Sequence, residues 1–153
     1  MSETGTKRSI PMAVNHKRVD HITRQHQIAA AARDIINGGG LASLTIQALA
    51  ARVGVTEAAL YRHVRSKDEI LLLLVDEIRV SLFQAISEAT RTDRNALEKL
   101  EHMLQLHLSY VEERRGVSFI IISEALRFGE PRVKTAARRL VDDYVELVGS
   151  IIS

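Results

Sequence analysis

Residues 44–69, LTIQALAARVGVTEAALYRHVRSKDE, have the pattern of two short helices joined at a glycine. Thr45 is placed to cap the first helix, in which apolar residues recur at helical spacing. Gly54 supplies a left-handed turn, and Thr56 caps a second helix that we expect to run through Val64. A helix-turn-helix of this kind places its second helix in the major groove of DNA.

The residues that the predicted core leaves free suit a DNA-reading surface. On the second helix, the face opposite the apolar positions carries Glu57, Ala58, Tyr61 and Arg62. Ser66-Lys67-Asp68-Glu69 have the Ser-x-x-Glu form of a capping box, so a further helix is expected to start there. This start puts the Lys67 ammonium near a first helical turn, where it can bind a phosphate.

Residues 53–71, VGVTEAALYRHVRSKDEIL, closely resemble the DNA-binding domain of the TetR family of bacterial regulators. The resemblance covers residues 20–90 and rests on Leu-Tyr-x-His followed by Ser-Lys in the register of the family. It implies that the DNA backbone is contacted by Thr45, Thr56, Tyr61, His63 and Lys67. It implies that the base-facing residues are Gln47, Glu57 and Ala58. Val64 stands where most members carry Phe, which alters packing and leaves the predicted contacts intact.

Positive charge is concentrated in the part of the chain that contains the helix-turn-helix. Residues 1–67 hold ten Lys/Arg and four Asp/Glu, whereas residues 68–153 hold eleven and fifteen, so the net charges are +6 and −4. A basic end suits phosphate binding, because neutralising phosphates releases counterions and supplies most non-specific affinity for DNA.

Other features narrow the class of protein. The chain has no apolar run of membrane-spanning length and no amino-terminal signal pattern, so we expect a cytoplasmic protein with no membrane partner. It also has no cysteine, which excludes disulfides, thiolate zinc sites and cysteine nucleophiles. A Gly-rich phosphate loop, a nucleophile elbow and an acid–base constellation are all missing, which argues against an enzyme and against a cofactor. Glu98 and His102 stand four residues apart with His107 beyond, but this spacing is common on solvated helices and does not predict a metal site.

The first nineteen residues carry several Lys and Arg without an apolar period, and we expect a flexible arm. Two interpretations remain open: a basic arm that enters the neighbouring minor groove, or a solubilising tail or expression remnant.

The whole pattern predicts an all-α fold. A first helix over residues 21–37 ends at three glycines, and the head of residues 20–67 is joined by a long helix, from Glu69 to Ile86, to a bundle within residues 68–153. In the bundle we expect a helix from Asp93 or Asn95 to Gly116. Residues 117–128 are apolar on nearly every side, which predicts a helix buried within the bundle. Pro131 begins the last helix.

The last helix has an apolar stripe too wide for one neighbour. Its members are Val133, Ala136, Ala137, Leu140, Val141, Tyr144, Val145, Val148, Ile151 and Ile152. A second copy of the chain can bury part of it, as in a homodimer that binds a palindromic operator, or the whole stripe can pack within one chain. Members of the family usually carry a further helix, whereas this sequence stops in an apolar stretch at Ser153, which leaves open whether the chain is truncated.

Several polar and aromatic residues lie among the apolar positions of the predicted bundle. A mixture of this kind is typical of a ligand pocket. The candidates are His102, Gln105, His107, Ser109, Tyr110, Phe119, Ser123 and Phe128.

The sequence therefore predicts a homodimeric transcriptional regulator, a repressor released from double-stranded DNA by a small-molecule effector. The alternative is a DNA-bound interaction protein, because residues 53–63 and the stretch Glu-Ala-Leu-Arg-Phe-Gly-Glu, residues 124–130, are similar to the branch of the family that acts in nucleoid occlusion and binds a cell-division protein.

Overall fold

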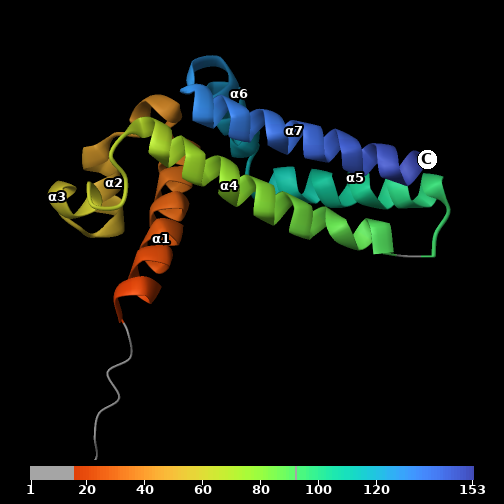
Figure 1. Ribbon diagram of the computed structural model, residues 1–153, viewed down its shortest axis with the longest axis horizontal. Coiled ribbons are helices and arrows are strands. Elements are labelled where there is room, and N and C mark those ends of the chain that lie inside the picture. Colours follow the sequence, from red (N-terminus) through yellow and green to blue (C-terminus); the bar gives the residue numbers. More distant parts are fainter. Residues whose placement is uncertain (1–15, 92) are drawn as a thin grey trace, which may run out of the picture.

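The computed structural model describes residues 16–91 and 93–153, in which all regular structure is helical (Figure 1). The first three helices form a head at one end, and the remaining four form a body (Figure 1). The prediction of an all-α fold is confirmed. The helices are α1 (His16–Gly39), α2 (Ile46–Val53), α3 (Glu57–Leu60), α4 (Lys67–Ile86), α5 (Ala96–Glu113), α6 (Val117–Phe128) and α7 (Pro131–Ile152), with short 3-10 turns at Leu41–Ser43 and Ser87–Arg91.

Helix α1 starts earlier than the sequence predicted. It begins at His16 rather than near residue 21, so residues 16–19 of the expected arm are helical, while residues 1–15 lie outside the described residues. Once a packed segment has nucleated a helix, each added residue gains a backbone hydrogen bond, so the helix can extend into solvent at a small cost in free energy. The added residues need no regular spacing of apolar side chains. The first part of α1 does extend away from the other helices (Figure 1).

Glycines end two helices of the head, as predicted. Gly40 has φ 75° and donates its N–H to the Ile36 carbonyl at 2.8 Å, and Gly54 has φ 78° and donates to the Ala50 carbonyl at 2.9 Å. Both backbones lie in the left-handed region, where a side chain is disfavoured. Gly54 fixes the angle between the two helices of the predicted DNA-reading pair.

The predicted caps are present as hydrogen bonds. The Thr45 hydroxyl accepts from the Ala48 N–H at 3.1 Å, the Thr56 hydroxyl accepts from the Ala59 N–H at 3.1 Å, and the Ser66 hydroxyl accepts from the Glu69 N–H at 3.2 Å. Each of these bonds satisfies an N–H that a helix start leaves unpaired. Asn95 and Glu98 form a reciprocal capping box at the start of α5.

The second helix of the pair is shorter than expected. Regular α-helix ends at Leu60, and the chain continues to Val64 as a turn in which the Arg62 N–H bonds to the Ala59 carbonyl, three residues back, at 3.3 Å. Tightening of this kind is common where a helix ends. Val64 is nevertheless fully buried, as its apolar character predicted.

One continuous core joins the head to the body. Buried side chains of α1, α2 and α3 pack with those of α4, and the same cluster reaches Ile121 of α6 and Ala137 of α7. A second, smaller cluster fills the far end around Met103, between α4, α5 and α7. Helix α4 belongs to both clusters and runs from the head into the body beside α5 and α7 (Figure 1).

The prediction that the helix at residues 117–128 is buried on every side is wrong. Helix α6 packs through Val117, Ile121 and Ala125, which recur every four residues and contact the core. Its opposite face is exposed, with Phe119 at 57% and Phe128 at 68% of full exposure. The described helices cover one side of α6 only, so its apolar composition exceeds what one chain buries.

The wide stripe of α7 is likewise only partly buried within one chain. Val133, Ala137 and Leu140 lie in the large core, whereas Val141 and Val145 are exposed.

None of the described helices is both long enough and apolar enough to cross a membrane.

Candidate DNA-binding interface

The base-facing candidates lie together with Tyr61, a predicted backbone contact, on the outer surface of the head. Gln47 of α2 and Glu57, Ala58 and Tyr61 of the α3 segment are all exposed, while Leu60 between them is fully buried. Helices α2 and α3 pack against each other, so their free side chains form one surface. We call this surface, with Gln47, Glu57, Ala58 and Tyr61, the reading face.

The two cap threonines border the reading face. Thr45 and Thr56 are exposed, and each uses its hydroxyl oxygen as an acceptor for a backbone N–H. The hydroxyl proton remains available as a donor, since a threonine hydroxyl has one O–H and two lone pairs. Each can therefore cap its helix and donate to a phosphate at the same time.

His63 is held against the first helix. Its ring stacks on His21 with centroids 5.1 Å apart, and the two Nδ1 atoms are 3.0 Å apart. One imidazole must donate and the other accept, so this contact requires at least one neutral ring. The contact joins α1 to the turn after α3, and its residues lie 42 positions apart, so the sequence pattern did not reveal it.

Lys67 is paired within the chain. Its Nζ lies 3.3 Å from Oε1 of Glu124 on α6, and its side chain remains 49% exposed. Next to it, the Asp68 carboxylate accepts the Glu130 N–H at 2.8 Å. The first turn of α4 is thus bound both to α6 and to the turn that leads into α7.

A junction between head and body surrounds Glu77 of α4. Its Oε1 pairs with Arg33 of α1 and lies 3.2 Å from Nη1 of Arg114, just after α5. The Arg114 guanidinium lies 4.6 Å from the ring centroid of Tyr110, whose hydroxyl is 3.0 Å from Oγ of Ser81. These contacts link three helices, and sequence patterns missed them because each joins distant segments.

The predicted ligand-pocket residues do not line one cavity. His102 and Gln105 lie in a shallow depression on α5 with Glu98, whereas Phe119 and Ser123 lie in a different depression on α6. Tyr110 is buried against α4 through its bond to Ser81. His107 contacts the Tyr144 hydroxyl through Nδ1 at 2.6 Å.

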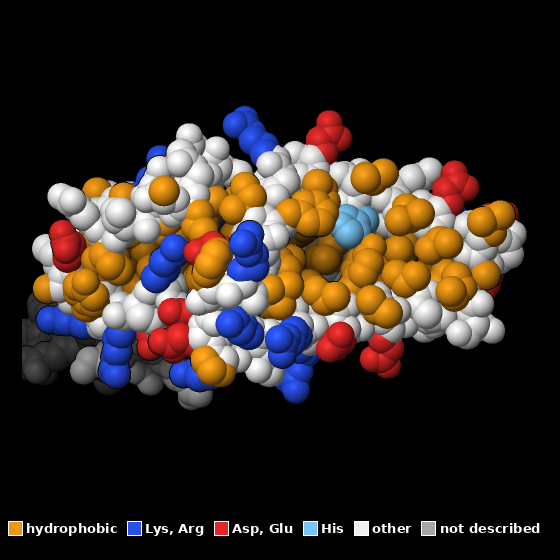
Figure 2. Space-filling view, turned by 90° about the horizontal axis from the view of Figure 1, so that it is seen from above, with side chains coloured by type: hydrophobic (Ala, Val, Ile, Leu, Met, Phe, Trp, Pro, Cys, Tyr) orange, Lys and Arg blue, Asp and Glu red, His pale blue; other side chains and the backbone are white. Residues whose placement is uncertain are grey.

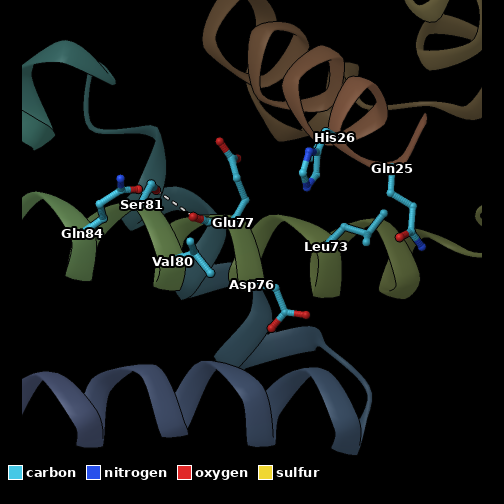
Figure 3. Close-up of a pocket in the computed structure, with 9 residues that line it drawn as sticks. Gln25, His26, Leu73, Asp76, Glu77, Val80, Ser81 and Gln84 are labelled. Atoms are coloured by element: carbon cyan, nitrogen blue, oxygen red, sulfur yellow. Dashed lines mark hydrogen bonds between the residues drawn. The ribbon is translucent and has the colours of Figure 1, made fainter. Parts of the chain in front are cut away.

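A different groove lies between α1 and α4. Its volume is about 490 Å³, and Figure 3 shows Gln25 and His26 of α1 above the α4 side chains Leu73, Asp76, Glu77, Val80, Ser81 and Gln84. Burial raises the pKa of the Asp76 carboxyl, and the nearby charge of Arg79 opposes this shift. The groove borders the Glu77 junction, so an occupant would touch both the head and the body.

An apolar face covers the body far from the reading face. Figure 2 shows apolar side chains gathered over the half of the molecule that α5 and α7 occupy. This α5–α7 apolar face consists of the exposed residues Leu97, Leu104, Leu108, Val141, Val145 and Ile152. Large exposed apolar patches mark interaction surfaces.

Two of the three residues considered as metal ligands have other partners. Glu98 completes the capping box of α5, and His107 contacts Tyr144. Within residues 16–91 and 93–153, no group of three His, Cys, Asp or Glu side chains is placed to hold a metal ion.

The head matches a known family. Residues 28–74, which include α2, α3 and the first turns of α4, match the family described as bacterial regulatory proteins, tetR family. This part of the chain is a TetR-family amino-terminal DNA-binding domain. The match includes every predicted DNA-contact residue from Thr45 to Lys67.

Solved structures of TetR-family regulators share the fold beyond the head. The regulator PfmR from Thermus thermophilus superposes with a TM-score of 0.70 at 26% identity, over 82% of this chain and 68% of that one. A TetR-like regulator from Rhodococcus sp. RHA1 superposes with a TM-score of 0.68 at 22% identity, over 94% of this chain and 72% of that one. The chain therefore has the domain and fold of a TetR-family transcriptional regulator.

Several curated relatives are nucleoid occlusion factors. The nucleoid occlusion factor SlmA of Aliivibrio fischeri strain MJ11 is 30% identical over 78% of this chain and 61% of its own length. The protein of the same name from Vibrio cholerae is 31% identical over 86% of this chain and 65% of its own length. The chain thus spans less than two thirds of these relatives.

Proposed function

We propose that this chain binds specific DNA sequences through its reading face and represses transcription in the cytoplasm. The observation that carries the proposal is the pair of capped helices α2 and α3. Their caps and the buried Leu60 fix the backbone, while Gln47, Glu57, Ala58 and Tyr61 remain exposed on one side. Gln47 and Glu57 offer the amide and carboxylate groups that bind base edges, and Ala58 offers a methyl contact to thymine.

Contacts to the DNA backbone set the register of the protein on DNA, and contacts to the bases set its preference for a particular sequence. The residues that bind phosphates lie on the edge of the reading face or around it. They are Thr45, Thr56, Tyr61, His63 and Lys67. Phosphate contacts act on all sequences alike, so they supply affinity without specificity.

The proposed protein acts as a homodimer. The α5–α7 apolar face supports this, because it gathers six exposed apolar residues on two adjacent helices. A two-fold dimer would present two reading faces to the half-sites of a palindrome. Glutamate at both Leu108 and Val145 is expected to shift sedimentation from dimer to monomer, whereas Val80→Glu, on the exposed side of α4, is not. A monomeric parent chain, or a dimer unaffected by the double change, would contradict this arrangement.

Release by a small molecule requires a ligand whose affinity differs between two head positions. The groove between α1 and α4 supports such a mechanism, because its walls belong to the head and to the long helix of the body (Figure 3). A ligand that separated these walls would favour a different angle between them and so lower the affinity for DNA.

A second candidate function is that of a DNA-bound interaction protein. The relatives described as nucleoid occlusion factors favour it, as does the exposed face of α6 with Phe119, Ile120 and Phe128. In this case a cell-division protein would bind the chain while it is on DNA.

Selection of bound duplexes from random DNA by the purified chain tests the main proposal. A palindromic consensus, bound far more tightly than unselected DNA, is expected for a dimeric sequence-specific regulator. Recovery of no motif, with affinity that falls steeply in salt, would instead mean that only the phosphate backbone is bound.

A further inference from the structure

Lys67, a predicted phosphate contact, is the first residue of helix α4. Its ammonium lies 3.3 Å from the Glu124 carboxylate, although the two residues are 57 positions apart and Glu124 belongs to α6. The Lys67 side chain is 49% exposed, whereas the Glu124 side chain is only 20% exposed. The surrounding residues therefore restrict the Glu124 side chain more than the flexible Lys67 side chain, which reaches over to the carboxylate.

A phosphate and the Glu124 carboxylate would compete for the same ammonium. A lysine ammonium is a point charge on a long stem, and the position that best neutralises one anion is not the best position for a second anion. A carboxylate within reach of the ammonium also repels an approaching phosphate. Both effects oppose DNA binding as long as Glu124 stays beside Lys67.

The surrounding contacts hold this arrangement in place. The Asp68 carboxylate accepts the Glu130 N–H at 2.8 Å, which ties the first turn of α4 to the turn between α6 and α7. The buried Ile121 and Ala125 of α6, on either side of Glu124, pack into the large core. A shift of α6 relative to α4 would therefore change the distance between Lys67 and Glu124.

We propose that Glu124 is a positioning residue that withholds Lys67 from DNA, so that the placement of α6 sets the strength of one phosphate contact. This inference rests on the proposed phosphate contact of Lys67. By linkage, DNA that captures Lys67 releases Glu124, and any ligand or partner that captures Glu124 strengthens DNA binding by the same factor. The pair thus couples the exposed surface of α6 to the DNA-binding head.

The test measures the affinity of variants for a fluorescein-labelled duplex of mixed sequence, because a phosphate contact does not depend on sequence. Glu124→Gln is expected to tighten binding about two- to fivefold at low salt, which is the strength of a partly exposed ion pair. The gain should shrink as salt is added. Glu146→Gln removes the same charge from the far half of α7 and serves as the matched control.

A Lys67→Met background identifies the cause of the gain. If Glu124 acts through Lys67, Glu124→Gln adds no affinity once Lys67 is Met. A gain that persists in this background, or a gain equal to that of Glu146→Gln, overturns the inference. If Glu124→Gln has no effect although Lys67→Met weakens binding, the inference fails and the phosphate contact stands. If Lys67→Met binds as tightly as the parent chain and also leaves the affinity of Glu124→Gln unchanged, the phosphate contact itself is wrong and the inference fails with it. Circular dichroism of each variant verifies that the helices remain folded.

Discussion

The Glu77 carboxylate of α4 binds the Arg33 guanidinium of α1, and through this ion pair the DNA-binding head is fixed to the long helix of the body. The same Oε1 lies 3.2 Å from Arg114, so one carboxylate oxygen serves two cations. All three side chains are less than a third exposed. One anion therefore reinforces the packing between the head and the body through two arginines.

Replacing that anion with a neutral amide tests its role. Glu77→Gln keeps the shape of the side chain but leaves two arginines without their partner, so we expect the free energy of unfolding to fall by about 1–3 kcal/mol. Urea unfolding measures the change. Asp34→Asn breaks the well-exposed pair with Arg52 and should cost at most about 1 kcal/mol. Equal losses in the two variants would show that the Glu77 junction is no more than a surface ion pair.

The turn of the helix-turn-helix gives a prediction about backbone conformation. Gly54 has φ 78°, and no neighbouring atom lies within 4 Å of the place where a β-carbon would stand, so Gly54→Ala meets no steric clash. Its cost is the left-handed backbone alone, about 1 kcal/mol. Gly54→Asn should cost less, because asparagine tolerates this region.

Gly38→Ala is the control for that experiment. Gly38 also has open space around it, but it lies within α1 without a positive φ, so alanine there should be neutral or slightly stabilising. If thermal unfolding shows the same effect at both glycines, the left-handed turn does not contribute to stability.

The pair formed by His107 and Tyr144 predicts a dependence on pH. Burial lowers the pKa of His107 below 6.5 and raises the pKa of Tyr144, so at neutral pH a protonated tyrosine hydroxyl faces a neutral imidazole. As the pH falls through the unfolded-state pKa of about 6.5, the unfolded chain takes up the proton first and the free energy of unfolding decreases. Above that pH this contribution is fully present.

Replacing the imidazole should make this decline shallower. His107→Asn keeps a polar group beside Tyr144 but does not titrate, so its stability should fall less than that of the parent chain as the pH is lowered from about 7.5 to about 5. The exposed His26 on α1 supplies the control variant His26→Asn. Parallel stability curves for the parent and His107→Asn would exclude His107 as the source of the decline.

Local signals made the caps and turns of this fold predictable. Thr45, Thr56 and Asn95 each bond to an N–H three residues ahead, so the pattern and the contact lie within one turn of helix. Gly54 was predictable for the same reason, because the left-handed conformation it adopts favours one residue type. The reading face followed once the buried positions of α2 and α3 were known.

Contacts between distant helices were not predictable from one sequence. Helical spacing shows that Glu124 and Glu77 lie on particular faces, but it does not show which helix those faces meet. The ligand-pocket residues failed to converge for this reason, since His102 and Phe119 belong to faces that point to different surfaces. The burial of α6 was overestimated, because its composition shows that its side chains are apolar but not how many other helices pack against it.

Tyr61 is expected to bind the DNA backbone. It is 47% exposed at the edge of the reading face, so Tyr61→Ala removes a contact without opening the core. Affinity should fall by a similar factor for the selected duplex and for unrelated duplexes, as measured by fluorescence anisotropy. A loss of preference at one base position would assign Tyr61 to base contacts instead.

The proposal that the exposed side of α3 reads bases is tested most directly by repeating the selection from random DNA with Glu57→Ala. Glu57 is exposed on the first turn of α3, so its side chain can be shortened without opening the core. We expect a consensus that matches that of the parent chain except at one pair of positions related by the palindrome, where the preference relaxes. An unchanged consensus would contradict the base-reading role of Glu57, because its side chain would then contribute nothing to the preference for any base pair.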